Sequence, residues 1–560
     1  MKRIPRIVSN AGIATMVSTV LLVGANASFP TRSAAASRPL PTLNWPGLVG
    51  DASWVASLDP ADINDGVSGG VVQMVQANLV KVLPNGQPIP DLATWKISHN
   101  RRIYWFTIRK NARFSNGDPV TAQDVVYSLT RALLPSTHGP IAMAQLGNIA
   151  GAAAVNTGKT KHLRGIKILS RRKVQVTLTA PAAYWPALMS YNTGDILDQR
   201  IVAGHKAGVY LTNTCSANVG AGPFMFVCRN TSSNRSSFYP IGATPTITMV
   251  PNPYFYGRKP AYRVVMHAIA NPDTSYLVFQ SGQLDATTIP PLHVAQNRHR
   301  PGFKEVPTGT LDWLAPDLHT APFNNLHCRL AIAYAINQNA INNQIERHTQ
   351  ITIHTILPKG IPGWYPGRNN PQYNPVKARQ QLSQCPGGLH NVPLVYYKAS
   401  TASDNQFSAI QNMLAAIGIT VTLRGLSLND WLNVVDQPLK KTHTPIAEST
   451  WGAAFADGEQ FFDFLLVPGL PTNISGYNNP TVTRLIHQAD VAASAARRRA
   501  IFIRASHIVV SQGVMIPIDQ PLSFSLVKPW VHGLVPSVYL GSAGVAPRGG
   551  EWANVTVSRH

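Results

Sequence analysis

The sequence predicts a mixed α/β protein made of two lobes. Its 560 residues, 44% of them hydrophobic, exceed what one average domain holds, so we expect two or three compact units. Both halves of the chain contain helical patterns followed closely by alternating strand patterns, which indicates helices packed on sheets. The sequence has no internal repeat of solenoid length.

Three segments carry the prediction for the first half. The run Arg102–Lys110 is rich in β-branched and aromatic residues and predicts a strand. Thr121, followed three residues later by Asp124, predicts the N-cap of a helix that continues to about Leu133. Lys173–Leu178 alternates apolar and polar residues, which predicts a half-buried strand.

The second half repeats the pattern with two helical faces and a strand. The first face is predicted from the spacing of Leu326, Leu330, Ala333, Tyr334 and Ile341. The second is predicted from Phe407, Ile410, Leu414 and Ile417. Gly418 marks the end of the second helix, and the alternation of Ile419, Val421 and Leu423 then predicts a strand.

The N-terminus predicts export. Three basic residues precede a mostly apolar stretch over residues 11–23, and an A-x-A cleavage site follows at 25–27, with a second candidate at 34–36. We therefore expect a signal peptide over residues 1–27 and a disordered tether over 28–42, which is rich in Ser, Ala, Pro and Arg. An uncleaved membrane anchor stays open as the alternative, although the stretch is short for a spanning helix. No Cys follows it for lipid attachment.

The charge balance is set by a scarcity of acids. Lys and Arg number 48 against 25 Asp and Glu, a net charge of +23, while charged residues make up only 13% of the chain. The densest basic runs are short, at 171–173 and 497–499, which argues against nucleic-acid binding. Two interpretations remain: attraction to an anionic cell surface, or life in an acidic medium where carboxylates are protonated.

The four cysteines are expected to form disulfides, since export permits them. Cys215 and Cys228 are the most plausible pair because they would close a short loop, whereas the pairing of Cys328 and Cys385 stays open. No metal site is expected, because the chain has no C-x-x-C and its 17 histidines form no tight ligand motif. Catalysis and a cofactor have no support either, since no nucleophile or phosphate-loop motif is present.

Dispersed motifs in a fixed order point to one family. Residues Pro90–Leu134 contain Leu92-Ala93-Thr94-Trp95, close to the pattern "LA-x-x-W", then an aromatic strand, and a run close to "F-x-D-G-x-P-x-T-A-x-D-V-x-x-S", with Asn116 in place of the usual Asp. This stretch resembles the signature region of the family 5 extracellular solute-binding proteins, the oligopeptide-, dipeptide- and nickel-binding components of ABC importers. The resemblance spans roughly residues 43–540 and continues through Val219–Val227, Asn252–Tyr256, Ser281–Asp285, Phe323–Ile341 and Val527–Gly533.

The resemblance implies a periplasmic-binding-protein-like fold of class II, also called cluster C, with an extra subdomain in the first lobe and a hinge between lobes. Residues 43–270 would form lobe 1, 271–520 lobe 2, and 521–560 the return to lobe 1. Closure of the lobes would enclose a peptide or similar small solute. A monomer at the cell surface or in the periplasm would then deliver this ligand to ABC permease subunits.

Other functions are compatible with the same sequence. The fold could bind a metal chelate, haem or a sugar instead of a peptide. In a different class, the chain could be a surface receptor or adhesin without transport, or a secreted hydrolase. We expect no enzyme activity and no nucleic-acid partner.

The ligand site is also inferred from the resemblance. The family's segment "G-W-x-A-D-Y-x-D-P" is similar to residues 450–458, where Ala454 stands in place of the acid that holds a peptide's α-ammonium. A free amine is then expected to bind weakly unless Asp457 or Glu459 takes over that role. The expected ligand-binding residues are Trp54, Trp313, Trp451, Gly452, Ala454 and Asp457. For the tryptophans, a place in the core is the alternative.

Overall fold

A computed structural model describes most of the chain beyond the N-terminus. The described residues are 39–46, 57–63, 66–139, 141–182, 184–207, 211, 214–228, 246–269, 271–453, 457–492, 494–537, 545–547 and 550–558. The expected signal peptide and most of the tether lie outside the described residues, as do Trp54 and Ala454. Contacts divide the chain into Met1–Pro39 and Leu40–His560, and the second unit is described below.

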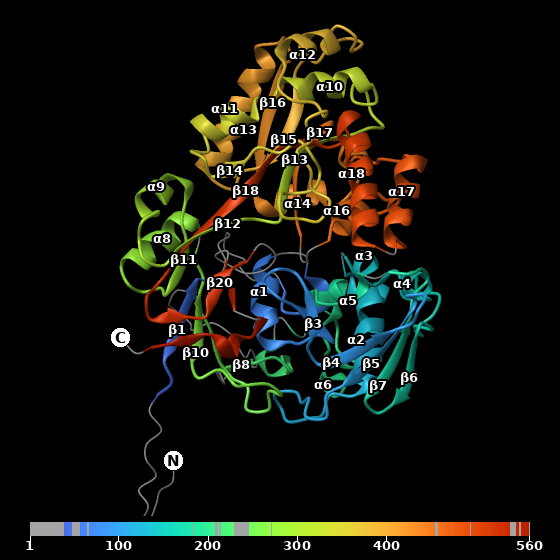
Figure 1. The fold of residues 1–560 in the computed structure, drawn as a ribbon, viewed down its shortest axis with the longest axis vertical. Coiled ribbons are helices and arrows are strands. Elements are labelled where there is room, and N and C mark those ends of the chain that lie inside the picture. The colour runs from blue at the N-terminus through green and yellow to red at the C-terminus, as the bar shows by residue number, and fades with distance from the viewer. Residues whose placement is uncertain are drawn as a thin grey trace, which may run out of the picture. The chain divides into compact units, whose positions relative to one another are not determined.

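Two four-stranded sheets form from the first half of the chain (Figure 1). The first has the order β1 (Thr42–Pro46), β10 (Arg263–His267), β9 (Thr246–Pro251) and β8 (Phe224–Phe226). The second is the antiparallel sheet β4 (Ala93–Ile97), β5 (Ile103–Ile108), β7 (Lys173–Thr177) and β6 (Ile166–Ser170). Helix α1 (Gly66–Val75) and the hairpin of β2 (Val80–Val82) and β3 (Pro88–Pro90) lie in sequence between β1 and β4.

Local signals determine the second of these sheets. The side chains of Tyr104, Phe106 and Ile108 are buried on one face of β5, as its alternation requires. Helix α2 (Ala122–Leu133) begins with a capping box in which Thr121 and Asp124 each accept the other's backbone N–H. The predicted strands at 102–110 and 173–178 and the helix at 121–133 are therefore confirmed.

The second half forms an eight-stranded sheet with helices on both faces (Figure 1). Its main path is β11 (Ala286–Thr288), β18 (Ile516–Val527), β13 (Thr310–Pro316), β17 (Ile446–Gly452), β15 (Val392–Tyr397) and β16 (Val421–Leu426). Strands β12 (Phe303–Pro307) and β14 (Gln350–Ile351) pair with β18. Strand β18 is 12 residues long, which lets it pair with β13 near its start and β11 near its end.

The two faces of this sheet are covered by different helices. One face shares a core with α10 (Leu326–Ala335), α12 (Pro375–Leu382) and α13 (Thr401–Ala415). The other shares a core with α14 (Leu428–Val435), α16 (Glu459–Leu466), α17 (Pro480–Asp490) and α18 (Ala495–Ser511). Both cores are apolar, so burial from either side holds the sheet in place.

The predicted helical face across residues 326–341 is wrong. The chain leaves the helical conformation after Ala335, and a separate helix, α11 (Gln338–Gln344), begins after Asn337, whose Oδ1 accepts the N–H of Ala340 at 3.0 Å. The buried face of α10 is also different: Cys328, Ala331, Ile332 and Ala335 are buried, while Leu326 is 39% exposed. Small residues on that face let α12 approach α10 closely. The second predicted helix, α13, is confirmed, and Gly418 follows it with φ +94°.

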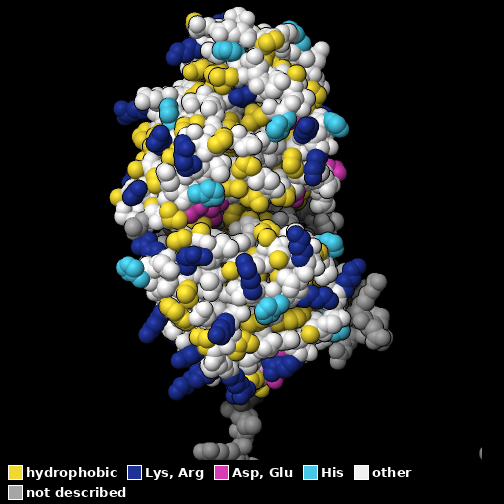
Figure 2. All heavy atoms as spheres, turned by 90° about the vertical axis from the view of Figure 1, so that its right-hand side faces the viewer, with side chains coloured by type: hydrophobic (Ala, Val, Ile, Leu, Met, Phe, Trp, Pro, Cys, Tyr) yellow, Lys and Arg dark blue, Asp and Glu magenta, His cyan; other side chains and the backbone are white. Residues whose placement is uncertain are grey.

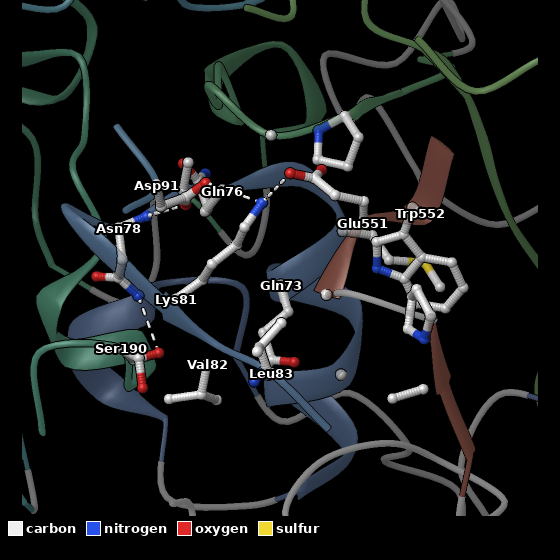
Figure 3. Close-up of a pocket in the computed structure, with 18 of the residues that line it drawn as sticks. Gln73, Gln76, Asn78, Lys81, Val82, Leu83, Asp91, Ser190, Glu551 and Trp552 are labelled. Carbon is white, nitrogen blue, oxygen red and sulfur yellow. Dashed lines mark hydrogen bonds and ion pairs between the residues drawn. The ribbon is translucent and has the colours of Figure 1, made fainter. Parts of the chain in front are cut away.

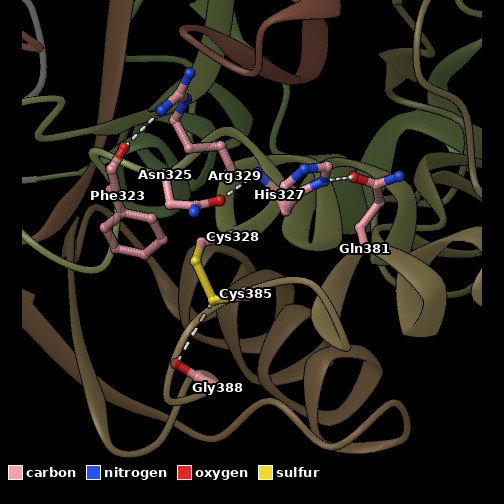
Figure 4. The surroundings of a disulfide bond; sticks show 8 residues. All are labelled: Phe323, Asn325, His327, Cys328, Arg329, Gln381, Cys385 and Gly388. Atoms are coloured by element: carbon pink, nitrogen blue, oxygen red, sulfur yellow. Dashed lines mark hydrogen bonds between the residues drawn. A yellow bond between two sulfur atoms is a disulfide. The ribbon is translucent and has the colours of Figure 1, made fainter.

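Two disulfides join the cysteines. Cys215 pairs with Cys228 in the first half of the chain, and Cys328 of α10 pairs with Cys385, just after α12 (Figure 4). Near the second bond, Asn325 caps α10 by accepting the N–H of His327 at 2.8 Å. The Cys328–Cys385 bond therefore ties α10 to the segment just after α12, across a sequence separation of 57 residues.

The C-terminal strands return to the first sheet. Short pairs form between β19 (Val531–His532) and β22 (Thr556–Val557), and between β20 (Leu534–Pro536) and β21 (Val545–Pro547). Their buried residues, including Val531 and Val545, share a core with Leu43 and Trp45 of β1. Across the described residues, no helix has both the length and the apolar character that crossing a bilayer requires.

Candidate functional site

Strands β13 and β17 position two of the predicted ligand-binding residues. In their antiparallel register Leu311 lies opposite Trp451, and Trp313 lies opposite Ser449. Since side chains alternate along a strand, Trp313 and Trp451 point to the same face of the sheet. Gly452, the last residue of β17, is exposed.

The two tryptophans have different surroundings. Trp313 is only 2% exposed and belongs to the core beneath α14 and α16, an environment that fits a structural role. Trp451 is half-buried and meets Phe464 of α16 edge to face, with ring centroids 5.6 Å apart. Its buried indole Nε1 has no hydrogen-bond partner among the described residues. Such a donor is destabilising unless a ligand or water accepts from it.

The carboxylate of Asp457 is already occupied. Arg498 of α18 donates to it from Nε, at 3.2 Å to Oδ1 and 3.1 Å to Oδ2, and from Nη2 at 2.9 Å to Oδ1. Oδ1 also accepts the N–H of Glu459 at 2.9 Å, at the start of α16. Asp457 is thus neutralised by Arg498, 41 residues later in the chain.

Four carboxyls gather around this one guanidinium, and we call Asp457, Glu459, Asp463 and Asp490 the acidic cluster. Arg498 lies 3.7 Å from Asp490, and three carboxyl oxygens of the cluster, Glu459 Oε2, Asp463 Oδ1 and Asp490 Oδ1, have no hydrogen-bond partner among the described residues. Burial, followed by the charge of neighbouring carboxylates, raises the pKa of Glu459 and Asp463 well above the ordinary value. Burial lowers the pKa of Arg498, but the neighbouring carboxylates of Asp457 and Asp490 outweigh this effect and raise its pKa above the ordinary value.

The acidic cluster is also one of the places where the two halves of the chain touch. The Tyr184 hydroxyl donates to Asp463 Oδ2 at 3.4 Å, and the Arg498 guanidinium lies 4.6 Å from the centre of the Tyr184 ring. Nearby, Arg101 donates to the carbonyl of Ala492 at 3.4 Å.

Figure 2 shows Lys and Arg spread over one face of the molecule, with few Asp and Glu side chains and a hollow between its upper and lower parts. Sequence reasoning missed Arg498 and Tyr184, because only the fold brings them to Asp457 and Asp463.

A separate cavity lies between segments of the first half of the chain and its C-terminal segment (Figure 3). It measures about 140 Å³ and is lined by residues of α1, β2, residues 190–195 and the C-terminal segment 545–552. Lys81 forms ion pairs with Glu551 and, at 3.5 Å, with Asp91. Tyr256 donates from its hydroxyl to Asp91. None of the expected ligand-binding residues that the structure describes lines this cavity, so the two sites are distinct.

The surroundings of the described site residues contain no metal-ligand set: no group of three His, Cys, Asp or Glu side chains among the described residues is arranged to hold an ion. The acidic cluster holds an arginine instead. What this region offers chemically is binding: an indole donor, aromatic walls and carboxyl groups.

Comparison with known proteins gives relatives along most of the chain. The oligopeptide-binding protein OppA of Bacillus subtilis (strain 168) is 26% identical over 484 residues, covering 82% of this chain and 85% of that protein. The dipeptide-binding protein DppE of the same organism is 26% identical over 496 residues, covering 86% and 87%.

Solved structures show the same fold. The murein tripeptide binding protein MppA of Escherichia coli matches with a TM-score of 0.76 at 20% identity, covering 93% of this chain and 98% of that chain. Haemophilus influenzae OppA in complex with the peptide RPPGFSPFR matches with a TM-score of 0.75 at 20% identity, covering 93% and 99%. The α/β fold is therefore that of the two-lobed periplasmic binding proteins, as the sequence predicted.

The sequence profile described as bacterial extracellular solute-binding proteins, family 5, middle part, matches residues 87–470. This match includes the second four-stranded sheet, most of the eight-stranded sheet, Trp451, and Asp457, Glu459 and Asp463 of the acidic cluster. The chain belongs to the family 5 bacterial extracellular solute-binding proteins, a family of binding proteins and not of enzymes.

Proposed function

We propose that this chain is the extracellular substrate-binding subunit of an ABC importer that captures peptides or similar small solutes. The observation that carries the proposal is the similarity, along more than four fifths of the chain, to oligopeptide- and dipeptide-binding proteins. Residues 43–270 with the return 521–560 would form one lobe and residues 271–520 the other. The ligand would lie between them and pass to a membrane permease, with no chemical step.

Trp451 is the proposed anchor for the ligand. Its unpartnered indole N–H lies near the exposed end of β17, beside the segment that resembles the family's ligand-binding motif. A peptide carbonyl would accept from it, and the ring would supply a flat apolar wall. Gly452 and the residues outside the described part, Trp54 and Ala454, remain proposed members of the same site, while Trp313 would support that site from the core.

The amino terminus of a peptide would lack a strong partner here. Ala454 has no charge, and Asp457 is neutralised by Arg498. Glu459 and Asp463 keep unpaired oxygens, but burial raises their pKa values, so each keeps its proton to a higher pH than an exposed carboxyl does. We therefore propose that the protein does not rely on a free α-ammonium, in contrast to what the family motif implies.

Calorimetry with matched free and N-acetylated peptides tests both points. We expect the free and the N-acetylated peptide to bind with affinities within about tenfold of each other, because the free amine lacks a strong partner in this site. If the amine did form a charged hydrogen bond to a desolvated carboxylate, losing that bond on acetylation would cost about 2–5 kcal/mol. Trp451→Phe should weaken both peptides by up to about tenfold, since it removes one hydrogen bond and keeps the ring. Trp105→Phe is the matched control. The indole Nε1 of Trp105 donates to Gln175 Oε1 at 3.1 Å within the second four-stranded sheet, which does not contain Trp451. A strong preference for the free amine would contradict this reading of the site, and no binding of any peptide would contradict the proposed ligand class.

A further inference from the structure

The outer face of the second four-stranded sheet carries an ordered set of lysines. The antiparallel register places Lys96 of β4, Trp105 of β5, Gln175 of β7 and Lys167 of β6 opposite one another, in one row across the sheet. The Trp105 indole donates to Gln175 at 3.1 Å, so the side chains of this row share one face. With neighbouring strands about 4.8 Å apart, the backbones of the two lysines at the ends of the row are roughly 14 Å apart.

This outer face is open to solvent. Helix α2 shares a core with the opposite face of the sheet, on which Tyr104 is buried. Lys96, Lys167 and Lys173 are all exposed, and Lys173 points the same way as Gln175, two residues later on β7. Among the described residues, none of these three lysines forms an ion pair with a carboxylate. Their charges are therefore free to meet an external anion.

The positive charge of the chain is concentrated around this sheet. Residues 93–182 contain 14 Lys and Arg but only two acids, Asp118 and Asp124, so about one sixth of the chain carries about half of its net charge of +23. Neither acid lies on a strand of the sheet, because Asp124 caps α2 and Asp118 lies 3.5 Å from Arg200. The side of Figure 1 on which β6 is labelled faces the viewer in Figure 2, where Lys and Arg outnumber acids. Such a field attracts polyanions.

Exposed apolar side chains accompany the lysines at one edge of the sheet. Strand β6 is an edge strand, and its Ile168 and Leu169 are 41% and 46% exposed. They lie between Lys167 and the basic run at 171–173. A soluble anionic polymer would engage only the cations. A membrane surface offers phosphate groups to the cations and also hydrocarbon to the apolar side chains, so it matches both features.

We propose that the outer face of this sheet binds the surface of an anionic phospholipid membrane. Lys96, Lys167 and Lys173 contact lipid phosphates, and their aliphatic stems lie along the headgroups. Ile168 and Leu169 enter the boundary between headgroups and acyl chains. This surface is independent of the proposed solute and would be present even if that proposal failed.

Co-sedimentation of the exported chain with lipid vesicles tests the inference. The vesicles contain either phosphatidylcholine alone or an equimolar mixture of phosphatidylglycerol and phosphatidylcholine. We expect binding to the mixed vesicles at low salt, weakening as salt is added, and much weaker binding to phosphatidylcholine alone. Changing all three lysines together, as Lys96→Gln, Lys167→Gln and Lys173→Gln, should weaken binding to the mixed vesicles at least about tenfold, because each contributes to the attraction by an anionic surface.

A second triple variant is the matched control. Lys377→Gln, Lys440→Gln and Lys441→Gln together remove three exposed charges from α12 and α15 (Leu439–Thr442), in the second half of the chain. This control should weaken binding by less than about twofold, since charges farther from the membrane than a Debye length are screened. Leu169→Ser, made alone, keeps every charge and should weaken binding severalfold, because it removes apolar area from the contact.

Several results would overturn the proposal. Equal losses in the two triple variants would show that binding follows net charge and not this face. No binding to the mixed vesicles, or equal binding to phosphatidylcholine alone, would exclude an anionic membrane contact. An unchanged affinity of Leu169→Ser would leave a surface that attracts anions of any kind.

Lysines on edge strands can also serve only to prevent pairing between sheets. In that case the first triple variant would aggregate without vesicles, and its monomeric fraction would bind the mixed vesicles as tightly as the unchanged chain, which also refutes the membrane contact. Light scattering and circular dichroism establish that each variant is monomeric and folded before sedimentation.

Discussion

Arg498 is expected to be one of the most sensitive positions in the second half of the chain. Its guanidinium is the cation that faces the acidic cluster, and it also donates to the carbonyl of Ala489. Arg498→Met keeps an apolar stem of similar length and removes the charge. Asp457 then loses its partner in a partly desolvated contact, and breaking such a pair typically costs about 3–5 kcal/mol.

Urea unfolding of the full chain, followed by circular dichroism, measures this cost. Arg497→Met is the matched control, because Arg497 is exposed on the same helix and should change the free energy of unfolding by less than about 0.5 kcal/mol. The loss in Arg498→Met should be smaller at low pH than at high pH, since the raised pKa values of Glu459 and Asp463 favour their protonation and so remove part of the repulsion. The reasoning is refuted if the two variants differ by less than about 1 kcal/mol at pH 8.

Three further outcomes are expected. Burial, then the charge of Asp312, raises the pKa of Glu448 to about 8. Between about pH 4.5 and pH 8 the folded state therefore holds a proton that the unfolded state releases. The free energy of unfolding should fall by about 1.4 kcal/mol per pH unit over this range. Glu448→Gln should flatten that part of a pH series of urea unfolding curves, and an unchanged slope would show that Glu448 does not cause it. Removing the Cys328–Cys385 bond by double substitution with Ala should cost about 4 kcal/mol, because the bond closes a loop across a separation of 57 residues; a loss below about 1 kcal/mol by the same measurement would contradict this. N-terminal sequencing of the exported protein should find a start near Ser28 or shortly after Ala36, and an intact Met1 would exclude cleavage.

The direction of these pKa shifts bears on the basic composition of the chain. Burial raises the pKa of Asp195, Glu346, Glu448, Glu459 and Asp519. A carboxyl whose pKa is higher in the folded state than in the unfolded state stabilises the fold at pH values below its unfolded-state pKa. This contribution is lost as the pH rises through its folded-state pKa. These five buried carboxyls therefore contribute more to folding stability at low pH than at high pH, which is compatible with the acidic-medium interpretation of the charge balance.

Local features of the fold could be predicted from the sequence because their causes are local. Thr121 and Asp124 cap α2 across three residues, and the alternation in β5 follows from one buried face. The prediction failed at residues 326–341, where Asn337 forms a cap instead of continuing the helix. Apolar spacing alone does not reveal that competition between a polar side chain and the helix.

The candidate sites depend on contacts that are distant in sequence. The motif register led to Trp451 and Asp457, but the partner of Asp457 is Arg498, which appeared in the sequence only as part of a basic run. The cavity brings Gln76 close to Asp195 and to the C-terminal segment, and no local pattern signals that arrangement. Burial and orphaned oxygens become visible only once the chain is folded.

The central claim is that this protein captures a small extracellular solute, and native mass spectrometry tests it most directly. The protein is purified from its exported location without unfolding and sprayed from a volatile buffer. We predict a one-to-one complex whose excess mass fits a peptide or similar small solute, with a reduced bound fraction in Trp451→Phe and an unchanged fraction in Trp105→Phe. A bare protein mass in every preparation, together with no uptake of added peptides, would contradict the claim.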